Sequence, residues 1–548
     1  MNITAAQWRP ADGLTLEPNA LKAVKETLEN LVLTAGPGAG KTEMLAQRAD
    51  FLLRTGMCPY PRRILAISFK VDASRNLKDR VHRRCGRALS SRFDSHTFHA
   101  FAKRLIDRFR PALSAENALD PDYTVGDQRF GHSQITFGDL VPFALEILDT
   151  CEVARNAVRQ TYTHVFLDEF QDCTNNQFAL IRAAFAGTGI RLTAVGDVKQ
   201  RIMGWVPGAV EGIFATFAKE FGTGSLNLYQ NFRSQPRLRR MQNAMVKVLE
   251  PAAALDDEAI QGNGGDIEVL PFDDSQQEAD AVADLISNWI RDEQVPPSEI
   301  AVLISKQPEH YGELLMEELR KRQIAFRNEQ KLQDLSVEPI ARFIVDFLLV
   351  VRGDREPDAY GRLIGGAPWS DSEEEREVNL QGFLDEIRRD YGNHVALNRS
   401  AVRPLVDRLL ETVGAQKVAA LSAEYEQGDY LKKKIDETLI RINELWTKGS
   451  DVRETLAKFS EDSAVRIMTI HKSKGLEFDS VVVLGVEQEA FFGKIVDERA
   501  AFFVAISRAK RRLKLTWAKE RARPSGNPYR WHTKRTPQAE FLGYSDGI

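Results

Sequence analysis

The chain has 548 residues, of which 74 are basic and 78 are acidic, so its formal net charge at pH 7 is −4. A chain this long exceeds a single hydrophobic core and indicates roughly three or four domains. Its 43% hydrophobic and 28% charged residues are ordinary for a soluble globular protein and exclude a uniform polycation. Nucleic-acid binding through a local basic channel is not excluded, because it depends on where the charge lies.

Three further observations indicate a cytoplasmic protein without a membrane anchor. The sequence has no run of about 18 apolar residues, so we expect no membrane-spanning helix. Its first residues, MNITAAQWRPADG, lack the basic and apolar regions of a secretory signal. The four cysteines are scattered without a CxxC pair, so neither a structural zinc site nor a disulfide framework is expected.

The first strong motif is LVLTAGPGAGKT, at residues 31–42. Leu31–Thr34 predicts a short buried strand, and Lys41 opens a helix that runs to about Leu53. Between them, glycines let backbone N–H groups point at an anion, and the helix N-terminus adds a positive dipole. The alternative is a simple glycine-rich turn, but the strand–loop–helix context favours a P-loop. The residues expected to bind the phosphates are Ala35, Gly36, Pro37, Gly38, Ala39, Gly40, Lys41 and Thr42, with Thr42 also on Mg²⁺.

A pair of carboxylates follows another apolar run in HVFLDEFQDCTNNQF, residues 164–178. His164–Leu167 predicts a buried strand that ends at Asp168 and Glu169. Adjacent carboxylates repel each other, so their position indicates that a cation or a reaction uses them. Alone, the pair would be read as a solvated strand end. Together with the P-loop, it predicts that Asp168 holds Mg²⁺ and that Glu169 orients and deprotonates the attacking water.

These motifs resemble those of UvrD/PcrA/Rep-type superfamily 1A DNA helicases. DEFQD, at residues 168–172, is the Walker B form typical of that group. The remaining blocks occur in the expected order: ILAISFKVDASRNLKDRV (64–81), SHTFHAFAKRLI (95–106), ITFGDLVPFALEIL (135–148), LTAVGDVKQRIMGW (192–205), LNLYQNFRS (226–234), VRIMTIHKSKGLEFDSVVVLG (465–485) and DERAAFFVAISRAKRRLKLTWA (497–518).

The resemblance implies an α/β fold with two RecA-like parallel-sheet P-loop domains and reduced, mainly helical 1B and 2B insertions. Within 429–446, the spacing of Leu431, Ile435, Leu439, Ile442 and Leu445 predicts a helix with one buried stripe. The expected boundaries are 1–100 plus 136–232 for domain 1A, 101–135 for a short 1B, 233–350 plus 463–518 for domain 2A, 351–462 for 2B, and 519–548 for a basic C-terminal tail.

The resemblance also implies roles at the ATP site. Gln200 would sense the γ-phosphate, and Arg233 and Arg508 would each supply a guanidinium from across a cleft. Phe232 would stack on the adenine, and Glu477 would contact the ribose. Without the motif context, each arginine would be read as a surface ion pair. With it, the predicted catalytic residues are Lys41, Glu169, Gln200, Arg233 and Arg508.

A single-stranded DNA track is implied by side chains inside the same motifs. Aromatic faces stack on bases and cations follow the backbone, which gives sequence-independent binding. Core packing is an equally good interpretation for Phe69 and Phe98. The predicted DNA-binding residues are Ser68, Phe69, Lys70, Phe98, His99, Trp205, Thr469, His471 and Lys472.

The predicted function is an ATP- and Mg²⁺-dependent, 3′-to-5′ single-stranded-DNA translocase or helicase that acts at single-strand/double-strand junctions in repair, replication restart or defence. The alternative is a DNA-gated ATPase subunit that controls a nuclease partner in a Gabija-like anti-phage system. The reduced insertions and the altered block at Met203 and Val206 favour considering it. A weaker alternative is a degenerate ATP-binding scaffold.

Overall fold

The structure, a computed structural model, forms two units that are each described by themselves. The first contains residues 1–118, 138–330 and 465–548, and the second contains residues 119–137 and 331–464. None of the helices described is long and apolar enough to span a membrane. The residues that the structure describes are 3–69, 71–126, 128–202, 210, 212–328, 335, 338–352, 356–366, 373–391, 399–414, 418, 421, 425, 430–446, 455–456, 459, 464–524 and 526–548.

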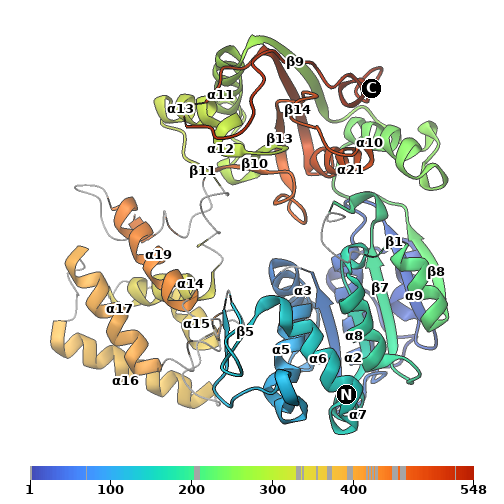
Figure 1. Ribbon diagram of the computed structural model, residues 1–548, viewed down its shortest axis with the longest axis vertical. Coiled ribbons are helices and arrows are strands. Elements are labelled where there is room, and N and C mark those ends of the chain that lie inside the picture. Colours follow the sequence, from blue (N-terminus) through green and yellow to red (C-terminus); the bar gives the residue numbers. More distant parts are fainter. Residues whose placement is uncertain are drawn as a thin grey trace. The chain divides into compact units, whose positions relative to one another are not determined.

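The first unit contains two six-stranded sheets, each built only from parallel strand pairs, which confirms the predicted fold class (Figure 1). Parallel strands are covered by helices on both faces, which is why the central strand IAVLI is buried at every position. In such sheets, ligands bind at the carboxyl ends of the strands.

The first sheet has the strand order β3-β2-β6-β7-β1-β8. Its strands are β1 (Asn30–Ala35), β2 (Arg63–Ser68), β3 (Phe93–Thr97), β6 (Tyr162–Leu167), β7 (Arg191–Gly196) and β8 (Thr223–Leu228). The helices of this part are α1 (Pro18–Lys25), α2 (Lys41–Arg54), α3 (Val71–Cys85), α4 (Arg87–Ser90), α5 (Phe98–Phe109), α6 (Leu140–Thr150), α7 (Glu152–Thr161), α8 (Asn175–Phe185) and α9 (Ile213–Phe221).

The second sheet has the order β11-β12-β10-β13-β14-β9. Its strands are β9 (Asp266–Asp274), β10 (Ile300–Ile304), β11 (Phe326–Asn328), β12 (Val465–Thr469), β13 (Phe478–Leu484) and β14 (Ala509–Glu520). Its helices are α10 (Pro236–Leu249), α11 (Ser275–Arg291), α12 (Pro308–Tyr311), α13 (Glu313–Lys321), α21 (Ile495–Ile506) and α22 (Ala539–Gly543).

The segment expected as a basic tail instead packs on the second sheet, which corrects that expectation. The buried Arg521 forms ion pairs with Glu278 at 2.7 Å and Glu487 at 2.6 Å. The ring of Phe541 stacks on Phe502 with 4.6 Å between their centroids. Arg521, a basic residue of this segment, is therefore neutralised inside the fold.

The second unit is mainly helical. Its helices are α14 (Pro339–Val351), α15 (Pro357–Gly366), α16 (Glu373–Tyr391), α17 (Arg399–Val413) and α19 (Tyr430–Leu445), and it also holds the short strands β4 (Thr124–Gly126) and β5 (Gln134–Thr136). The predicted stripe of α19 is confirmed, because Ile442 is in the core and the other four members pack against it. The structure places α14 in this unit, whereas the sequence analysis drew that boundary at residue 350.

Candidate active site

The loop between β1 and α2 has the geometry of a phosphate cradle. Gly38 and Gly40 have φ angles of 69° and 76°, which side chains rarely adopt. A Cβ atom on Gly38 would lie 2.5 Å from Asn231 Oδ1 and 2.6 Å from Arg233 Cβ. Lys41, the first residue of α2, donates from Nζ to the carbonyl of Ala35 at 3.2 Å. The loop therefore needs glycine at Gly38, and the Lys41 side chain folds back onto it.

The two carboxylates lie at the same edge of the sheet as this loop. β6 and β1 flank β7, all three are parallel, and Asp168 and Glu169 follow β6 directly. Asp168 is only 5% exposed. Glu169 adopts a left-handed conformation, with φ 52° and ψ 39°. Such backbone strain is typical of functional sites, and here it turns the chain immediately after the strand.

Electrostatics link Lys41 to both carboxylates. Burial, followed by the repulsion of Glu169, raises the pKa of Asp168 to about 7, although Lys41 opposes the shift. Burial alone would raise the pKa of Glu169, but Lys474 and Lys41 outweigh it and the pKa falls below its usual value. Two carboxylates in this environment favour a nearby cation.

The oxygen donors present fit a magnesium ion. Mg²⁺ is usually held by one or two carboxylates together with phosphates and water, rather than by a cage of protein ligands. Thr42 and Asp168 offer a hydroxyl and a carboxylate of the required kind. Among the described residues, no larger group of His, Cys, Asp and Glu forms an alternative metal site.

A chain of hydrogen bonds connects these carboxylates to the second sheet. Gln171 donates to Glu169 Oε2 at 2.5 Å and accepts from the backbone N–H of Asp197 at 3.0 Å. Gln200 donates to Asp197 Oδ2 at 2.9 Å. Arg508, between α21 and β14, donates from Nη2 to Gln200 Oε1 at 3.0 Å. Three predicted catalytic residues are thereby brought into one network.

Arg508 is held in a fixed orientation. It is 2% exposed, and it also donates to the carbonyls of Val504 and Leu476, each at 3.0 Å. Burial, and then the charge of Arg233, lower the pKa of Arg508 to about 9. The guanidinium is therefore still charged at neutral pH, inside a low-dielectric site where its charge acts strongly.

Arg233 makes a contact that the sequence analysis did not anticipate. Its Nε donates to Glu477 Oε2 at 2.7 Å, and its Nη1 donates to the carbonyl of Ser507 at 3.0 Å. The residues predicted to serve the phosphates and the ribose thus form an ion pair with each other. Phe232, next to Arg233, is 62% exposed, and its backbone N–H donates to the carbonyl of Gly38.

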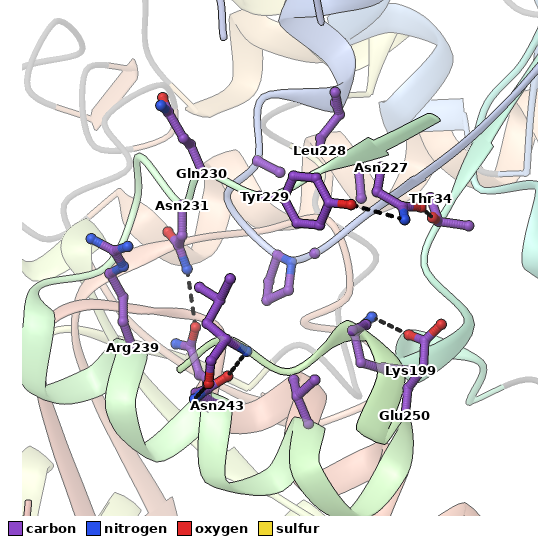
Figure 2. Close-up of a pocket in the computed structure, with 18 of the residues that line it drawn as sticks. Thr34, Lys199, Asn227, Leu228, Tyr229, Gln230, Asn231, Arg239, Asn243 and Glu250 are labelled. Atoms are coloured by element: carbon purple, nitrogen blue, oxygen red, sulfur yellow. Dashed lines mark hydrogen bonds and ion pairs between the residues drawn. The ribbon is translucent and has the colours of Figure 1, made fainter. Parts of the chain in front are cut away.

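A pocket of about 180 Å³ adjoins the outer side of the P-loop (Figure 2). In Figure 2, Lys199 from the segment after β7 faces Glu250, and their ion pair measures 2.6 Å. On another side, Asn231 donates to Gln242 of α10 at 3.0 Å. Residues from both sheet regions therefore line one pocket beside the loop.

Comparisons with known proteins agree with this geometry. The family described as UvrD-like helicase C-terminal domain matches residues 226–336 and 381–520, and an AAA domain family matches residues 20–205. The chain is 25% identical to DNA helicase II of Escherichia coli (strain K12), over 92% of this chain and 85% of that protein. It is 22% identical to the ATP-dependent DNA helicase PcrA of Staphylococcus aureus (strain Mu50), over 96% of this chain and 87% of that protein.

The chain belongs to the UvrD-like helicase family. This membership confirms the predicted resemblance and makes the protein an ATP-dependent DNA helicase by class.

On the first sheet of this UvrD-like helicase, four of the predicted DNA-binding residues lie at neighbouring strand ends. β2 pairs with β3 so that Ser68 lies opposite Thr97, which brings Phe69 and the start of α5 to one edge. Ser68 is fully buried and Phe69 is half-buried. Phe98 is 4% exposed, whereas His99 is half-buried, and burial lowers its pKa to about 4.

On the second sheet, three further predicted DNA-binding residues lie at the end of β12 or just after it. Thr469 ends the strand and is buried, His471 is half-buried, and Lys472 is exposed. Lys70 and Trp205 lie outside the described residues, as do Met203 and Val206 of the altered motif. The roles of all nine DNA-binding residues remain predictions.

Lys474 contacts the candidate active site of this helicase, although the motifs did not predict it. Its Nζ lies 2.5 Å from Asp172 Oδ2 and 3.7 Å from Glu169 Oε2, and it donates to the carbonyl of Gln200 at 2.9 Å. The signal in the sequence was the second lysine of HKSKG, but spacing alone does not distinguish it from Lys472. The structure separates them, because Lys474 is buried and Lys472 is exposed.

Replacing Lys474 with Met is expected to lower the free energy of unfolding by about 3 kcal/mol, because it leaves the Asp172 carboxylate buried without its cation. Urea unfolding followed by intrinsic fluorescence measures the change. Lys472→Met is the matched control and should change stability little, because Lys472 is exposed. The double variant Asp172→Asn/Lys474→Met should recover part of the loss. An unchanged unfolding free energy for Lys474→Met would contradict the assignment.

Proposed function

We propose that this UvrD-like helicase uses ATP hydrolysis to move 3′-to-5′ along single-stranded DNA and to separate strands at single-strand/double-strand junctions, in repair or replication restart. The names of its relatives, DNA helicase II and ATP-dependent DNA helicase PcrA, support DNA as the substrate. The geometry of the first unit supports coupling between hydrolysis and motion.

The site residues divide the chemistry among them. The backbone of the P-loop and Lys41 bind the triphosphate, and Thr42 and Asp168 would hold a magnesium ion, which would neutralise part of the triphosphate charge. Glu169 accepts a proton from the attacking water, and Gln171 orients its carboxylate through the bond at Oε2. Arg508 places a fixed positive charge where negative charge develops during phosphoryl transfer.

The bond between Arg508 and Gln200 is the observation that carries the proposal. Gln200 follows β7 of the first sheet, and Arg508 precedes β14 of the second. A γ-phosphate offers oxygens that attract both side chains, so the two sheet regions are held together in the ATP state. Loss of the phosphate removes that attraction and favours separation, which is the two-state element that a motor requires.

The DNA contacts are assigned to the strand ends described above. Phe69 and His99 lie at strand ends of the first sheet and are half-buried, and His471 and Lys472 lie after β12 of the second sheet. Each sheet region therefore offers its own contact with the DNA strand. Sheets that alternately approach and separate would then advance along the backbone. Base stacking and phosphate contacts give little sequence preference.

A strand-separation assay tests the proposal. The purified chain with ATP and Mg²⁺ is expected to separate a duplex carrying a 3′ single-stranded tail and to leave a 5′-tailed or blunt duplex intact. The matched control replaces ATP with ADP and should abolish separation. DNA-stimulated ATP hydrolysis without separation of any substrate would contradict the helicase proposal and favour the DNA-gated ATPase. A nuclease partner finds no support in the comparisons and stays a prediction.

A further inference from the structure

A second cavity lies at the end of the first sheet that is opposite the ATP site. It has a volume of about 540 Å³ and is lined at the start of β6 by Thr163 and His164 and at the start of β7 by Arg191. The ATP-site residues follow the other ends of the same two strands. This volume is in the range of pockets that hold small molecules.

The cavity carries an unbalanced positive charge. Three guanidinium groups line it, those of Arg62, Arg159 and Arg191, and none of its lining residues is Asp or Glu. Glu26 adjoins the lining residue Thr27 in the sequence, and its carboxylate accepts from the backbone N–H groups of Leu28 and Glu29. Guanidinium groups without carboxylates recognise phosphate or other oxyanions.

Two of these arginines are oriented by helix ends. Arg62 Nη2 donates to the carbonyls of Arg159 at 2.8 Å and Tyr162 at 2.6 Å, at the end of α7. Arg159 donates to the carbonyls of Ala184 and Ala183, at the end of α8. These bonds use only some of the donors of each arginine, since a guanidinium has five N–H groups. The buried Nε of Arg62 has no partner among the described residues.

Arg191 and His164 complete the cluster. No hydrogen bond or ion pair to the Arg191 guanidinium is found within the described part of the chain. His164 is 5% exposed, and its Nδ1 lies 2.9 Å from Thr163 Oγ1. Burial, followed by the charges of Arg48 and Arg191, lowers the pKa of His164 to about 3. The imidazole is therefore neutral and adds polar atoms without adding charge.

We propose that this cavity is a binding site for the phosphate group of a nucleotide-sized anion, separate from the ATP site. Arg62, Arg159 and Arg191 would contact the phosphate. Met57, which is half-exposed at the rim, offers an apolar surface for the rest of the ligand. A cavity with a buried histidine suits a small ligand better than a nucleic acid. The backbone of a nucleic acid would have to bend into the cavity to reach these residues.

The test uses the full-length protein with Lys41→Ala as background, so that the P-loop does not account for phosphate binding. Calorimetric titration with inorganic phosphate, and then with each ribonucleoside 5′-monophosphate, is performed at constant ionic strength in chloride. Adding Arg191→Ala is expected to weaken binding at least about tenfold, because one charge-assisted contact is lost. The matched control is Arg182→Ala, an exposed arginine of α8 that does not line the cavity, and it should leave affinity unchanged.

Three outcomes would overturn the proposal. Phosphate binding could disappear with Lys41→Ala alone, which would place all of it at the P-loop. It could persist with unchanged affinity in both Arg191→Ala and the charge reversal Arg191→Glu, although each must weaken it if the cavity binds phosphate. Arg191→Ala could weaken binding of a 20-nucleotide single strand while phosphate and mononucleotides never bind, which would identify a nucleic-acid contact instead. Circular dichroism of each variant verifies that the fold is retained.

Discussion

Glu169→Gln is expected to lower the turnover number for ATP by about 10²–10⁴-fold, the contribution typical of a general base. The amide keeps the size of the side chain but cannot accept the proton of the attacking water. Binding of ATP should persist, because Lys41 and the P-loop backbone are unchanged. Phosphate release with saturating single-stranded DNA measures turnover, and a fluorescent ATP analogue measures binding.

Glu220→Gln is the matched control for that experiment. Glu220 is an exposed residue of α9 and is not one of the predicted site residues, so the same chemical change should leave turnover unaltered. If Glu169→Gln hydrolyses ATP at the rate of the unsubstituted chain, Glu169 is not the base, and the degenerate-scaffold alternative gains support.

Arg508→Lys is expected to reduce turnover by about 10³-fold, the lower end of the effect of an arginine that stabilises phosphoryl transfer. The positive charge is kept, but a lysine cannot reproduce the fork that contacts Gln200, Val504 and Leu476 together. The loss should appear in the turnover number rather than in the KM for ATP, because the contact strengthens as charge develops in the transition state.

Arg511→Lys is the matched control, because it makes the same substitution at a nearby arginine outside the site. Arg511 lies three residues away, its side chain is 58% exposed, and its ion pair with Asp479 is long, at 3.5 Å. Surface pairs of this kind contribute little, so the control should keep full activity. Equal losses in Arg508→Lys and Arg511→Lys would show that the effect is not specific to the guanidinium at the site.

Much of the fold could be predicted from local patterns. The buried strand Leu31–Thr34 was located to within one residue of its observed bounds, Asn30–Ala35, because a short apolar run between turn residues has few alternatives. The strand Ala509–Glu520 does not follow a simple apolar run, since its charged residues Lys514 and Arg512 are neutralised by acids on other segments. The packing of the residues after Glu520 also depends on partners that are distant in the sequence, and a local sequence pattern does not identify such partners.

The site residues that lie at strand ends could be predicted from the sequence. The ion pairs between side chains from distant segments could not. Parallel strands bring Lys41, Asp168 and Gln200 to one edge by topology alone. The ion pair between Arg233 and Glu477 joins residues 244 positions apart. The choice of Lys474 over Lys472 depends on which lysine is buried, and that is decided by packing rather than by spacing.

The most direct test of the account is a crystal structure of the Glu169→Gln variant with ATP and Mg²⁺. We expect the triphosphate in the Gly36–Gly40 loop, the metal on Thr42 and Asp168, and the γ-phosphate in contact with both Lys41 and Arg508. A nucleotide bound elsewhere, or a γ-phosphate contacted by Lys41 while Arg508 stays out of reach, would contradict it.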